Sequence, residues 1–285
     1  MPSLIDIRRR IRSVKNMQQI TKAMKMVSAA KLRRAQDRAL ASRPYANMMG
    51  RILSNVAAAT AGNEEIAQLP LLQRREEKRI LFVVVSSDTG LAGAFNANLL
   101  RAAQRFIDEH RNHEIRIEAI GRKSRDYFRK RNFTITGAHV GIVDKPEYGK
   151  AAEIADKMIE LYSNAEVDAV HMAVNEFKSA MAPNLVIKKI LPLDVPEGGE
   201  QIDYIYEQSP QELLSALLPR YVKMQIYRAL LESITAYHAA RMSAMDAASS
   251  NAGEVIQDLT LNLNRVRQAN ITREIIEIVS GAAAL

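Results

Sequence analysis

One stretch of the sequence has the residue types of a phosphate-binding turn: Ser86-Ser87-Asp88-Thr89-Gly90-Leu91-Ala92-Gly93. It follows an apolar run and precedes a helical pattern, which is where α/β proteins bind phosphate groups. The stretch contains Gly-x-x-Gly, but it lacks both G-x-G-x-x-G and the Gly-Lys-Ser/Thr of a P-loop. The pattern therefore favours a tight turn with a structural or contact role over a nucleotide site.

The histidines and carboxylates form no recognisable catalytic or metal-binding set. His110 and His113 lie three residues apart beside Asp108 and Glu109, which is typical of a solvated helix end, and no His-Glu-x-x-His motif occurs. No Ser/His/Asp spacing marks a nucleophile elbow, and the chain has no Cys. We expect no catalytic residue, no metal and no cofactor. An α/β enzyme of unknown substrate remains one of three hypotheses, and the other two are given below.

The first segment is predicted to be one long helix, from Ser3 to about Ala57. Ser3 and Asp6 have the spacing of an N-cap with a capping-box acid. Apolar residues then step by three and four, as in a coiled coil, with a phase slip between two runs. The runs are Leu4, Ile7, Ile11, Val14 and Ile20, Met24, Val27. Pro44 is the candidate position for a kink.

The last segment is predicted to be a second long helix that begins at Ser209-Pro210-Gln211-Glu212, a capping box with Pro at the first helical position. Its apolar residues also step by three and four, at Leu217, Tyr221, Met224, at Ile256, Leu259, Leu263, Val266, and at Ile271, Ile275, Ile278. Neither helix can bury its stripe alone, so we expect an antiparallel pair. The second helix is the longer, and its apolar tip, residues 271–285, requires a socket in a partner.

Between the helices the pattern alternates strands with helices, which predicts a Rossmann-like α/β domain with a mostly parallel sheet. Strands are expected at 80–85, 115–120, 133–136, 167–174 and 185–191, and helices at 94–110, 123–131 and 150–162. The predicted organisation is an N-terminal coiled-coil helix at 1–58, a solvated connector at 59–78, the α/β domain at 79–195, a foot segment at 196–208, and a C-terminal coiled-coil helix at 209–285.

The net charge of +8 is concentrated in the first segment, because residues 1–57 hold 13 Lys and Arg against two acidic residues. Such a helix needs an acidic protein partner, a nucleic acid or a membrane surface. No aromatic residue precedes Tyr45, so base stacking is not available there. An acidic protein sleeve fits better, and the rival hypothesis is a basic coiled-coil protein that binds nucleic acid or acts as a scaffold.

Nothing in the sequence indicates export or a membrane span. The N-terminus has no apolar core of a signal peptide, and no run of 18 apolar residues occurs. We expect a chain that meets a membrane only through partners.

Several stretches resemble the gamma subunits of bacterial F-type ATP synthases over essentially the full length. The most specific are Ile20-Thr21-Lys22-Ala23-Met24-Lys25-Met26-Val27 and the run from Ile271 to Ala284, ITREIIEIVSGAAA. Further similar stretches are Ala41–Ala46, Ala239–Met242 and Asn264–Ala269. The resemblance implies a non-catalytic rotor shaft that couples proton flow to ATP synthesis and stands inside a ring of alternating alpha and beta subunits, where the ATP sites lie. It also implies the epsilon subunit and the membrane rotor c-ring as partners, one copy per complex, no nucleic acid, and a peripheral place on the cytoplasmic face of the bacterial plasma membrane.

The same resemblance implies roles for individual residues. Those that match shaft positions touching the beta subunits are Lys22, Met24, Arg241, Arg267, Gln268, Thr272 and Glu274. Those that match the foot region meeting the rotor ring are Tyr204, Tyr206 and Glu207. The turn from Gly90 to Gly93 is implied to face the beta subunit. Here the chain has Gly-Leu-Ala-Gly in place of the family's usual Gly-Leu-Cys-Gly, and it lacks the regulatory cysteines of the chloroplast form.

Overall fold

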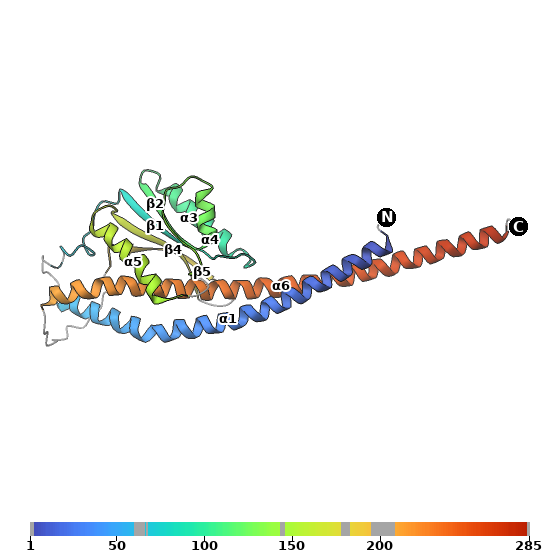
Figure 1. The fold of residues 1–285 in the computed structure, drawn as a ribbon, viewed down its shortest axis with the longest axis horizontal. Coiled ribbons are helices and arrows are strands. Elements are labelled where there is room, and N and C mark those ends of the chain that lie inside the picture. Colours follow the sequence, from blue (N-terminus) through green and yellow to red (C-terminus); the bar gives the residue numbers. More distant parts are fainter. Residues whose placement is uncertain are drawn as a thin grey trace. The chain divides into compact units, whose positions relative to one another are not determined.

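The computed structural model describes residues 3–59, 66, 68–142, 146–177, 183–194 and 209–283. The chain divides into two compact units, one made of Met1–Ala29 with Arg241–Leu285 and the other of Ala30–Ala240. Each long terminal helix contributes to both units (Figure 1). Of the predicted connector, 59–78, the structure describes residues 59, 66 and 68–78, whereas the predicted foot segment, 196–208, lies outside the described residues. The predicted domain boundaries stay predictions.

Helix α1, Leu4–Ala59, begins where the sequence predicted and continues past Pro44. The Oγ of Ser3 accepts a hydrogen bond from the main-chain N–H of Asp6 at 3.2 Å and donates one to the Asp6 carboxylate at 2.9 Å. These bonds satisfy one of the main-chain donors left free at a helix start and fix the entry of the chain. The Ser3 cap is confirmed.

Helix α6, Pro210–Ala283, is also continuous and passes Pro219. The main-chain N–H of Ser209 donates to the Glu212 carboxylate and the N–H of Glu212 donates to the Ser209 Oγ, each at 3.3 Å. This is the reciprocal capping box that the sequence predicted, with Pro210 at the first helical position, where no donor is needed.

The buried side of α1 differs from the predicted stripe. Its less exposed positions step by three and four without a phase slip, and we call them the α1 seam: Leu4, Ile7, Ile11, Val14, Gln18, Thr21, Lys25, Ser28, Leu32 and Ala35. Ile20 and Val27, which were predicted to belong to the stripe, are each 57% exposed. The prediction was wrong there because four polar residues occupy the seam, so counting apolar residues alone moved the stripe to the outer face.

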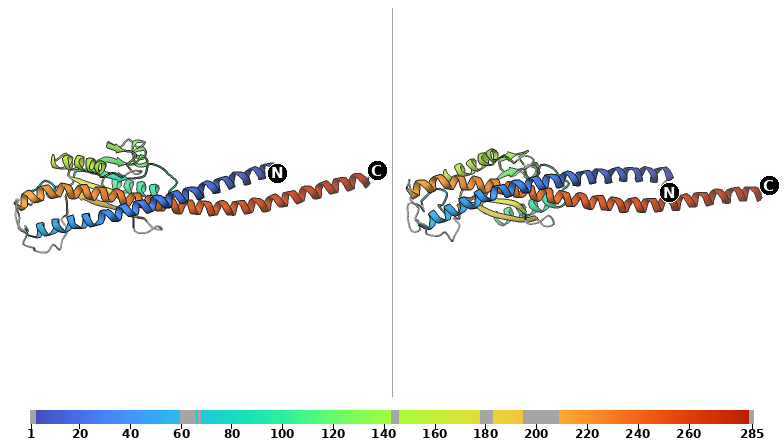
Figure 2. Two further views of the ribbon diagram at one scale, coloured as in Figure 1. Left: turned by 60° about the horizontal axis from the view of Figure 1, so that its bottom comes forward. Right: turned by 90° about the horizontal axis from the view of Figure 1, so that it is seen from below.

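The first unit contains an antiparallel pairing of the two terminal helices (Figures 1 and 2). The Nε2 of Gln18 donates to the main-chain oxygen of Ser249 at 3.2 Å, and the Nζ of Lys25 lies 2.6 Å from the Asp246 carboxylate. A Cβ on Gly253 would lie 3.1 Å from the Gln18 Nε2, so the glycine gives that amide its room. On α6 the predicted positions 256, 259, 263 and 266 are less exposed than their neighbours, as expected for the facing stripe.

A five-stranded sheet forms the centre of the second unit, in the order β3-β2-β1-β4-β5. Its strands are β1 (Arg79–Val85), β2 (Glu114–Ile120), β3 (Ile135–His139), β4 (Ala169–Phe177) and β5 (Pro183–Leu191). The first four run parallel and β5 pairs antiparallel with β4. The mostly parallel sheet is therefore confirmed. The predicted third strand begins two residues later than expected, because residues 128–133 form a turn after the preceding helix.

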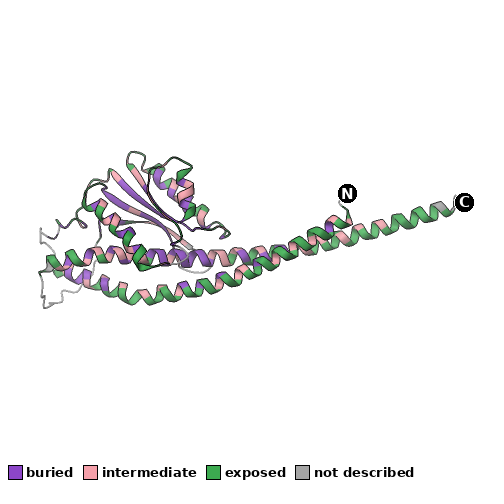
Figure 3. Cartoon of the chain, viewed as in Figure 1, coloured by how far each residue is buried: buried purple, intermediate pink, exposed green. Residues whose placement is uncertain are grey.

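Helices cover both faces of the sheet, as the continuous apolar run of β1 requires. The helices α3 (Phe95–Glu109), α4 (Arg122–Arg129) and α5 (Tyr148–Ser163) follow β1, β2 and β3 respectively. Ile80, Phe82 and Val84 form one cluster with α3 and with Phe128 of α4. The alternate residues of β1 form a larger cluster with α5 and with the ends of α1 and α6 that belong to this unit. These two clusters, on opposite faces of the sheet, make up a three-layered core in the second unit (Figure 3).

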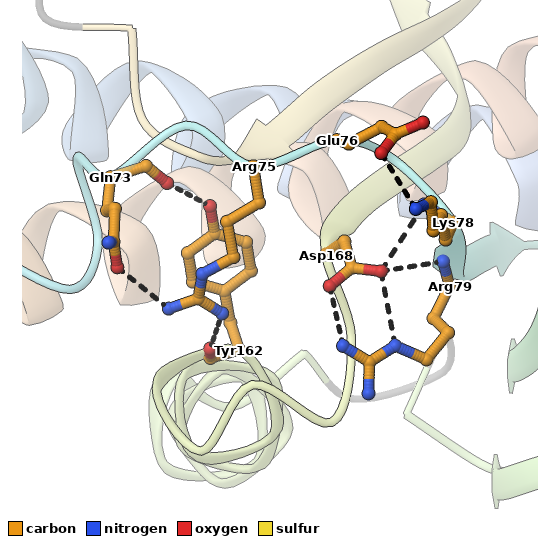
Figure 4. Close-up of polar contacts among 7 residues, drawn as sticks. All are labelled: Gln73, Arg75, Glu76, Lys78, Arg79, Tyr162 and Asp168. Atoms are coloured by element: carbon orange, nitrogen blue, oxygen red, sulfur yellow. Dashed lines mark hydrogen bonds and ion pairs between the residues drawn. The ribbon is translucent and has the colours of Figure 1, made fainter.

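The connector was predicted to be solvated, and its described apolar residues correct this. Ile66, Leu69 and Leu71 are 5–8% exposed and belong to the larger core cluster. Farther along, Arg75 lies over the ring of Tyr162 at 4.9 Å and donates to the main-chain oxygen of that residue (Figure 4). The charged stretch after Leu72 made the segment polar on average, and this composition concealed the three buried side chains.

Candidate functional site

The turn between β1 and α3 presents one large apolar side chain, Leu91, to solvent. Leu91 has φ 61° and Gly93 has φ 56°, both in the left-handed region, and the Leu91 side chain is 62% exposed. Ala92 and Phe95 next to it are buried. A non-glycine residue with positive φ costs conformational energy, so the surrounding contacts must hold this turn in place.

Asp88 ties this turn to the two neighbouring turns at the carboxyl edge of the sheet. Its carboxylate accepts the main-chain N–H of Arg122 at 2.9 Å and that of Gly141 at 3.0 Å, and the residue is buried. The loops after β1, β2 and β3 therefore converge on one carboxylate. A phosphate at this edge would meet that negative charge, which supports the structural interpretation of the turn.

The serines of the turn also bond within the protein. The Ser86 Oγ accepts the main-chain N–H of Ser124 at 2.8 Å, and the Ser87 N–H donates to the Asn96 Oδ1 at 3.1 Å. A Cβ on Gly121 would lie 2.3 Å from the main-chain oxygen of Ser86, so only glycine fits beside this turn. These bonds fix the polar atoms that a phosphate ligand would otherwise use.

Tyr237 on α6 contacts the exposed end of the turn, and this contact was not predicted from the sequence. Its hydroxyl shares a hydrogen bond with the Thr89 Oγ1, and its ring meets Phe95 edge-on with the centroids 5.6 Å apart. Both contacts lie within the second unit. The signal that could have been used is a tyrosine inside a helical stretch, Ser233 to Ala240, in which five of the eight residues are Ser, Thr or Ala.

The predicted shaft residues lie on the terminal helices in two separate groups. Lys22 is exposed and Met24 is partly buried on α1, close to the pairing of Lys25 with Asp246. Arg267, Gln268, Thr272 and Glu274 are exposed on α6. Between Asp246 and Arg267 the helix rises roughly 30 Å, so the structure does not bring the two groups together.

The remaining predicted positions are placed differently. Arg241 is partly buried on α6. Gly90 and Gly93 lie in the β1–α3 turn, where a Cβ on Gly90 would meet nothing within 4 Å. Tyr204, Tyr206 and Glu207 lie outside the described residues.

The tip of α6 exposes a concentration of apolar side chains. Each of Ile271, Ile275, Ile276, Ile278 and Val279 is 48–70% exposed. Leu4, where α1 begins, is near the start of the pairing, and α6 continues beyond it (Figure 1). Five apolar side chains left uncovered on a helix end are typical of a surface at which proteins bind one another.

Three titratable side chains meet beside the amino end of β4, from the chain before β1, from β4 and from the antiparallel strand β5. The Glu77 carboxylate accepts bonds from the Lys189 Nζ at 2.6 Å and from the His171 Nε2 at 3.0 Å. Burial alone would raise the pKa of Glu77, but these two bonds lower it. Burial lowers the pKa of His171, and its bond to Glu77 only partly offsets this. His171 is therefore held neutral near pH 7 and acts as a structural hydrogen-bond partner.

Among the described residues, no group of three or more His, Cys, Asp and Glu could hold a metal ion. In the same part of the chain, no helix is both long and apolar enough to cross a membrane.

The fold defines a class of protein in which an α/β domain is inserted between two long helices that pair antiparallel. A model of the ATP synthase family matches residues 3–285. The ATP synthase gamma chain of Solibacter usitatus (strain Ellin6076) is 60% identical over 284 residues, covering 100% of this chain and 99% of the relative. That of Anaeromyxobacter sp. (strain Fw109-5) is 52% identical, covering 100% of both. The chain belongs to the ATP synthase gamma chain family.

Solved structures support the same fold. A chain of the Euglena gracilis mitochondrial ATP synthase, in a structure of its OSCP/F1/c-ring, is similar with a TM-score of 0.69 and 19% identity, covering 99% of this chain and 94% of that one. A chain of the Tetrahymena thermophila central stalk/c-ring has a TM-score of 0.59 and 23% identity, covering 81% and 99%. Family membership supports the shaft hypothesis and gives no support to the nucleic-acid alternative.

Proposed function

We propose that this chain is the central rotor shaft of a bacterial ATP synthase, and that it couples proton flow through the membrane rotor to the conformational cycle of the catalytic beta subunits. The structural observation that carries the proposal is the uncovered apolar tip of α6, residues 271–279, on a helix that outlasts its partner. A shaft that turns within a socket needs an apolar end without fixed polar bonds. The chain itself supplies no catalytic group, and the ATP sites belong to its partners.

The partners follow from the family. A ring of alternating alpha and beta subunits surrounds the paired helices, and the basic face of α1 suits an acidic sleeve. Lys22, Met24, Arg241, Arg267, Gln268, Thr272 and Glu274 contact the beta subunits. Because the shaft is asymmetric, each orientation favours a different beta conformation, which shifts the population of open and closed sites.

The α/β domain and the foot lie nearer the membrane rotor in this proposal. Tyr204, Tyr206 and Glu207 meet the c-ring, the epsilon subunit binds beside them, and the turn from Gly90 to Gly93 faces the beta subunit. Leu91 is the side chain there that a partner can bury, because it is 62% exposed. The complex holds one copy of this chain and lies at the cytoplasmic face of the plasma membrane, where the chain is peripheral.

Reconstitution tests the proposal. The full chain is mixed with the alpha and beta subunits of its own enzyme, and complex mass and ATPase activity are measured. The proposal expects a stable complex with one copy of this chain and activity that depends on it. A chain that stays free in the presence of both subunits contradicts it.

A further inference from the structure

The outer side of the α3–α4 layer contains a groove that plays no part in the shaft surface. It has a volume of about 650 Å³ and lies between one face of α3 and the ring of Tyr127 on α4. Its apolar lining residues are Ala97, Leu100 and Tyr127. Its polar lining residues span about two turns of α3: Arg101, Gln104, Arg105 and Asp108. All of these residues belong to the second unit.

The surface around the groove is strongly basic. Residues 122–131 hold six Lys and Arg and one acidic residue, Asp126, whereas residues 58–210 as a whole hold slightly more acidic than basic residues. Asp126 is already paired with Arg125 at 2.8 Å. Arg101 and Arg105 are exposed on α3 at the rim of the groove. The basic residues of this segment and the two arginines of the groove give this part of the domain a positive charge that attracts an acidic ligand.

We propose that this groove docks an acidic, amphipathic segment of a partner protein. Apolar side chains of the segment would lie on Leu100 and Tyr127, and carboxylates would bind Arg101 and Arg105. These two arginines are one helical turn apart, roughly 6 Å along α3, which suits carboxylates spaced along a peptide. The proposal goes beyond the shaft function and does not depend on it.

Two features favour a peptide over a nucleotide or a free phosphate. The guanidinium of Arg131 lies 3.7 Å from the centroid of the Tyr127 ring and covers one of its faces, and no second aromatic side chain is among the lining residues, so a base could not be held between two rings. Asp108, bound to Arg111 at 3.1 Å, places a carboxylate at the end of the groove. Clustered phosphate charge would be repelled there, whereas separated carboxylates can avoid it.

The test is a titration of the full chain with three fluorescent or calorimetric probes. They are an amphipathic helical peptide of Leu and Glu, the matching peptide of Leu and Lys, and pyrophosphate. The double substitution R101E with R105E reverses the charge in the groove. The control, R122E with R129E, makes the same charge change on exposed residues of α4 that do not line the groove. The circular dichroism spectrum and the melting temperature report on folding.

The proposal expects saturable binding of the Leu/Glu peptide alone. Binding should weaken at least about tenfold in the groove variant and less than about threefold in the control. Equal weakening of peptide binding in both variants would show that only long-range charge attraction is at work and would overturn the proposal that the peptide docks in the groove. Pyrophosphate binding that is lost only in the groove variant, without peptide binding, would replace the peptide by a phosphate ligand. Failure of the unmodified chain to bind the Leu/Glu peptide would also overturn the proposal.

Discussion

Arg79 and Asp168 join the beginnings of the two central strands, β1 and β4. The guanidinium donates two hydrogen bonds to the carboxylate, Nη2 to Oδ1 at 2.7 Å and Nε to Oδ2 at 3.2 Å, and the main-chain N–H of Arg79 donates a third at 2.8 Å (Figure 4). The Asp168 side chain is 7% exposed. The hydrogen bonds from Arg79 lower the pKa of Asp168 below its ordinary value.

Replacing Asp168 by Asn should destabilise the chain by about 1–2 kcal/mol at pH 7, because charge-assisted hydrogen bonds to a buried acceptor are lost. Glu166→Gln is the matched control, since Glu166 is exposed two residues earlier. Urea unfolding followed by circular dichroism measures both. Equal stability of the two variants would mean that the pair contributes nothing.

The same pair gives a pH dependence with a definite sign. A carboxylate whose pKa is lower in the folded state stabilises the fold above its unfolded pKa, and this contribution is lost as the pH falls through the folded value. The stability difference between the unmodified chain and Asp168→Asn should therefore be constant from pH 5 to 7 and shrink below about pH 4. A difference that stays constant down to pH 2 would contradict the assignment.

The effect of His171 on stability should appear at a higher pH than that of Asp168. Because burial lowers its pKa, the unfolded chain takes up a proton before the folded chain does, so stability falls as the pH drops below about 6.5. Glu77, Lys189 and His110 are the charged or titratable groups near its ring. His171→Gln should reduce the loss of stability between about pH 7 and 5, measured by unfolding at each pH. If the variant loses as much stability over this pH range as the unmodified chain, another group causes the loss.

The corrected α1 seam predicts which apolar residues stabilise the helix. Leu32 is 7% exposed, whereas Ile20 and Leu40 are 57% and 53% exposed. Leu32→Ala should cost about 2 kcal/mol through lost burial, and Ile20→Ala and Leu40→Ala less than about 0.5 kcal/mol. The measurement is chemical unfolding of the full chain. A large loss of stability in Ile20→Ala would contradict the seam and support the stripe that was predicted from the sequence.

The helices, strands and caps could be predicted because each carries a local signal. Ser3 and Ser209 mark helix starts by their spacing to Asp6 and Glu212, and the apolar run of β1 indicates a strand buried on both faces. The seam could not be read in the same way, because Gln18, Thr21, Lys25 and Ser28 are polar. Gln18 and Lys25 have their partners on the other helix, more than 200 residues away in the sequence. Thr21 and Ser28 donate to main-chain oxygens of α1 itself, and such bonds form on any side of a helix.

The candidate site was predictable only in part, for a related reason. The glycines of the β1–α3 turn are visible in the sequence, but the groups that hold the turn are not its neighbours. Asp88 binds main-chain atoms of Arg122 and Gly141, and Tyr237 reaches Thr89 from the far end of the chain. Main-chain acceptors and donors leave no trace in residue types, so such contacts emerge only from the fold.

The α6 tip should matter for assembly and not for the fold of the chain. Ile275 and Ile278 are 54% and 70% exposed, so replacing both by Ser should change the stability of the isolated chain by less than about 0.5 kcal/mol. In the reconstituted complex the same variant should weaken binding, because apolar area is lost from the socket contact. Analytical ultracentrifugation of the complex measures this. Unchanged assembly would show that the tip does not contribute to binding in the complex.

Rotation of this chain inside its complex tests the shaft function most directly. The chain has no Cys, so Glu153→Cys, an exposed position on α5, gives a single attachment point for a bead. With the alpha and beta subunits fixed to a surface and ATP supplied, a turning shaft should rotate the bead in one direction, and the rotation should stop when ATP is withdrawn. A complex that hydrolyses ATP only in the presence of this chain, while the bead stays still, would contradict a turning shaft.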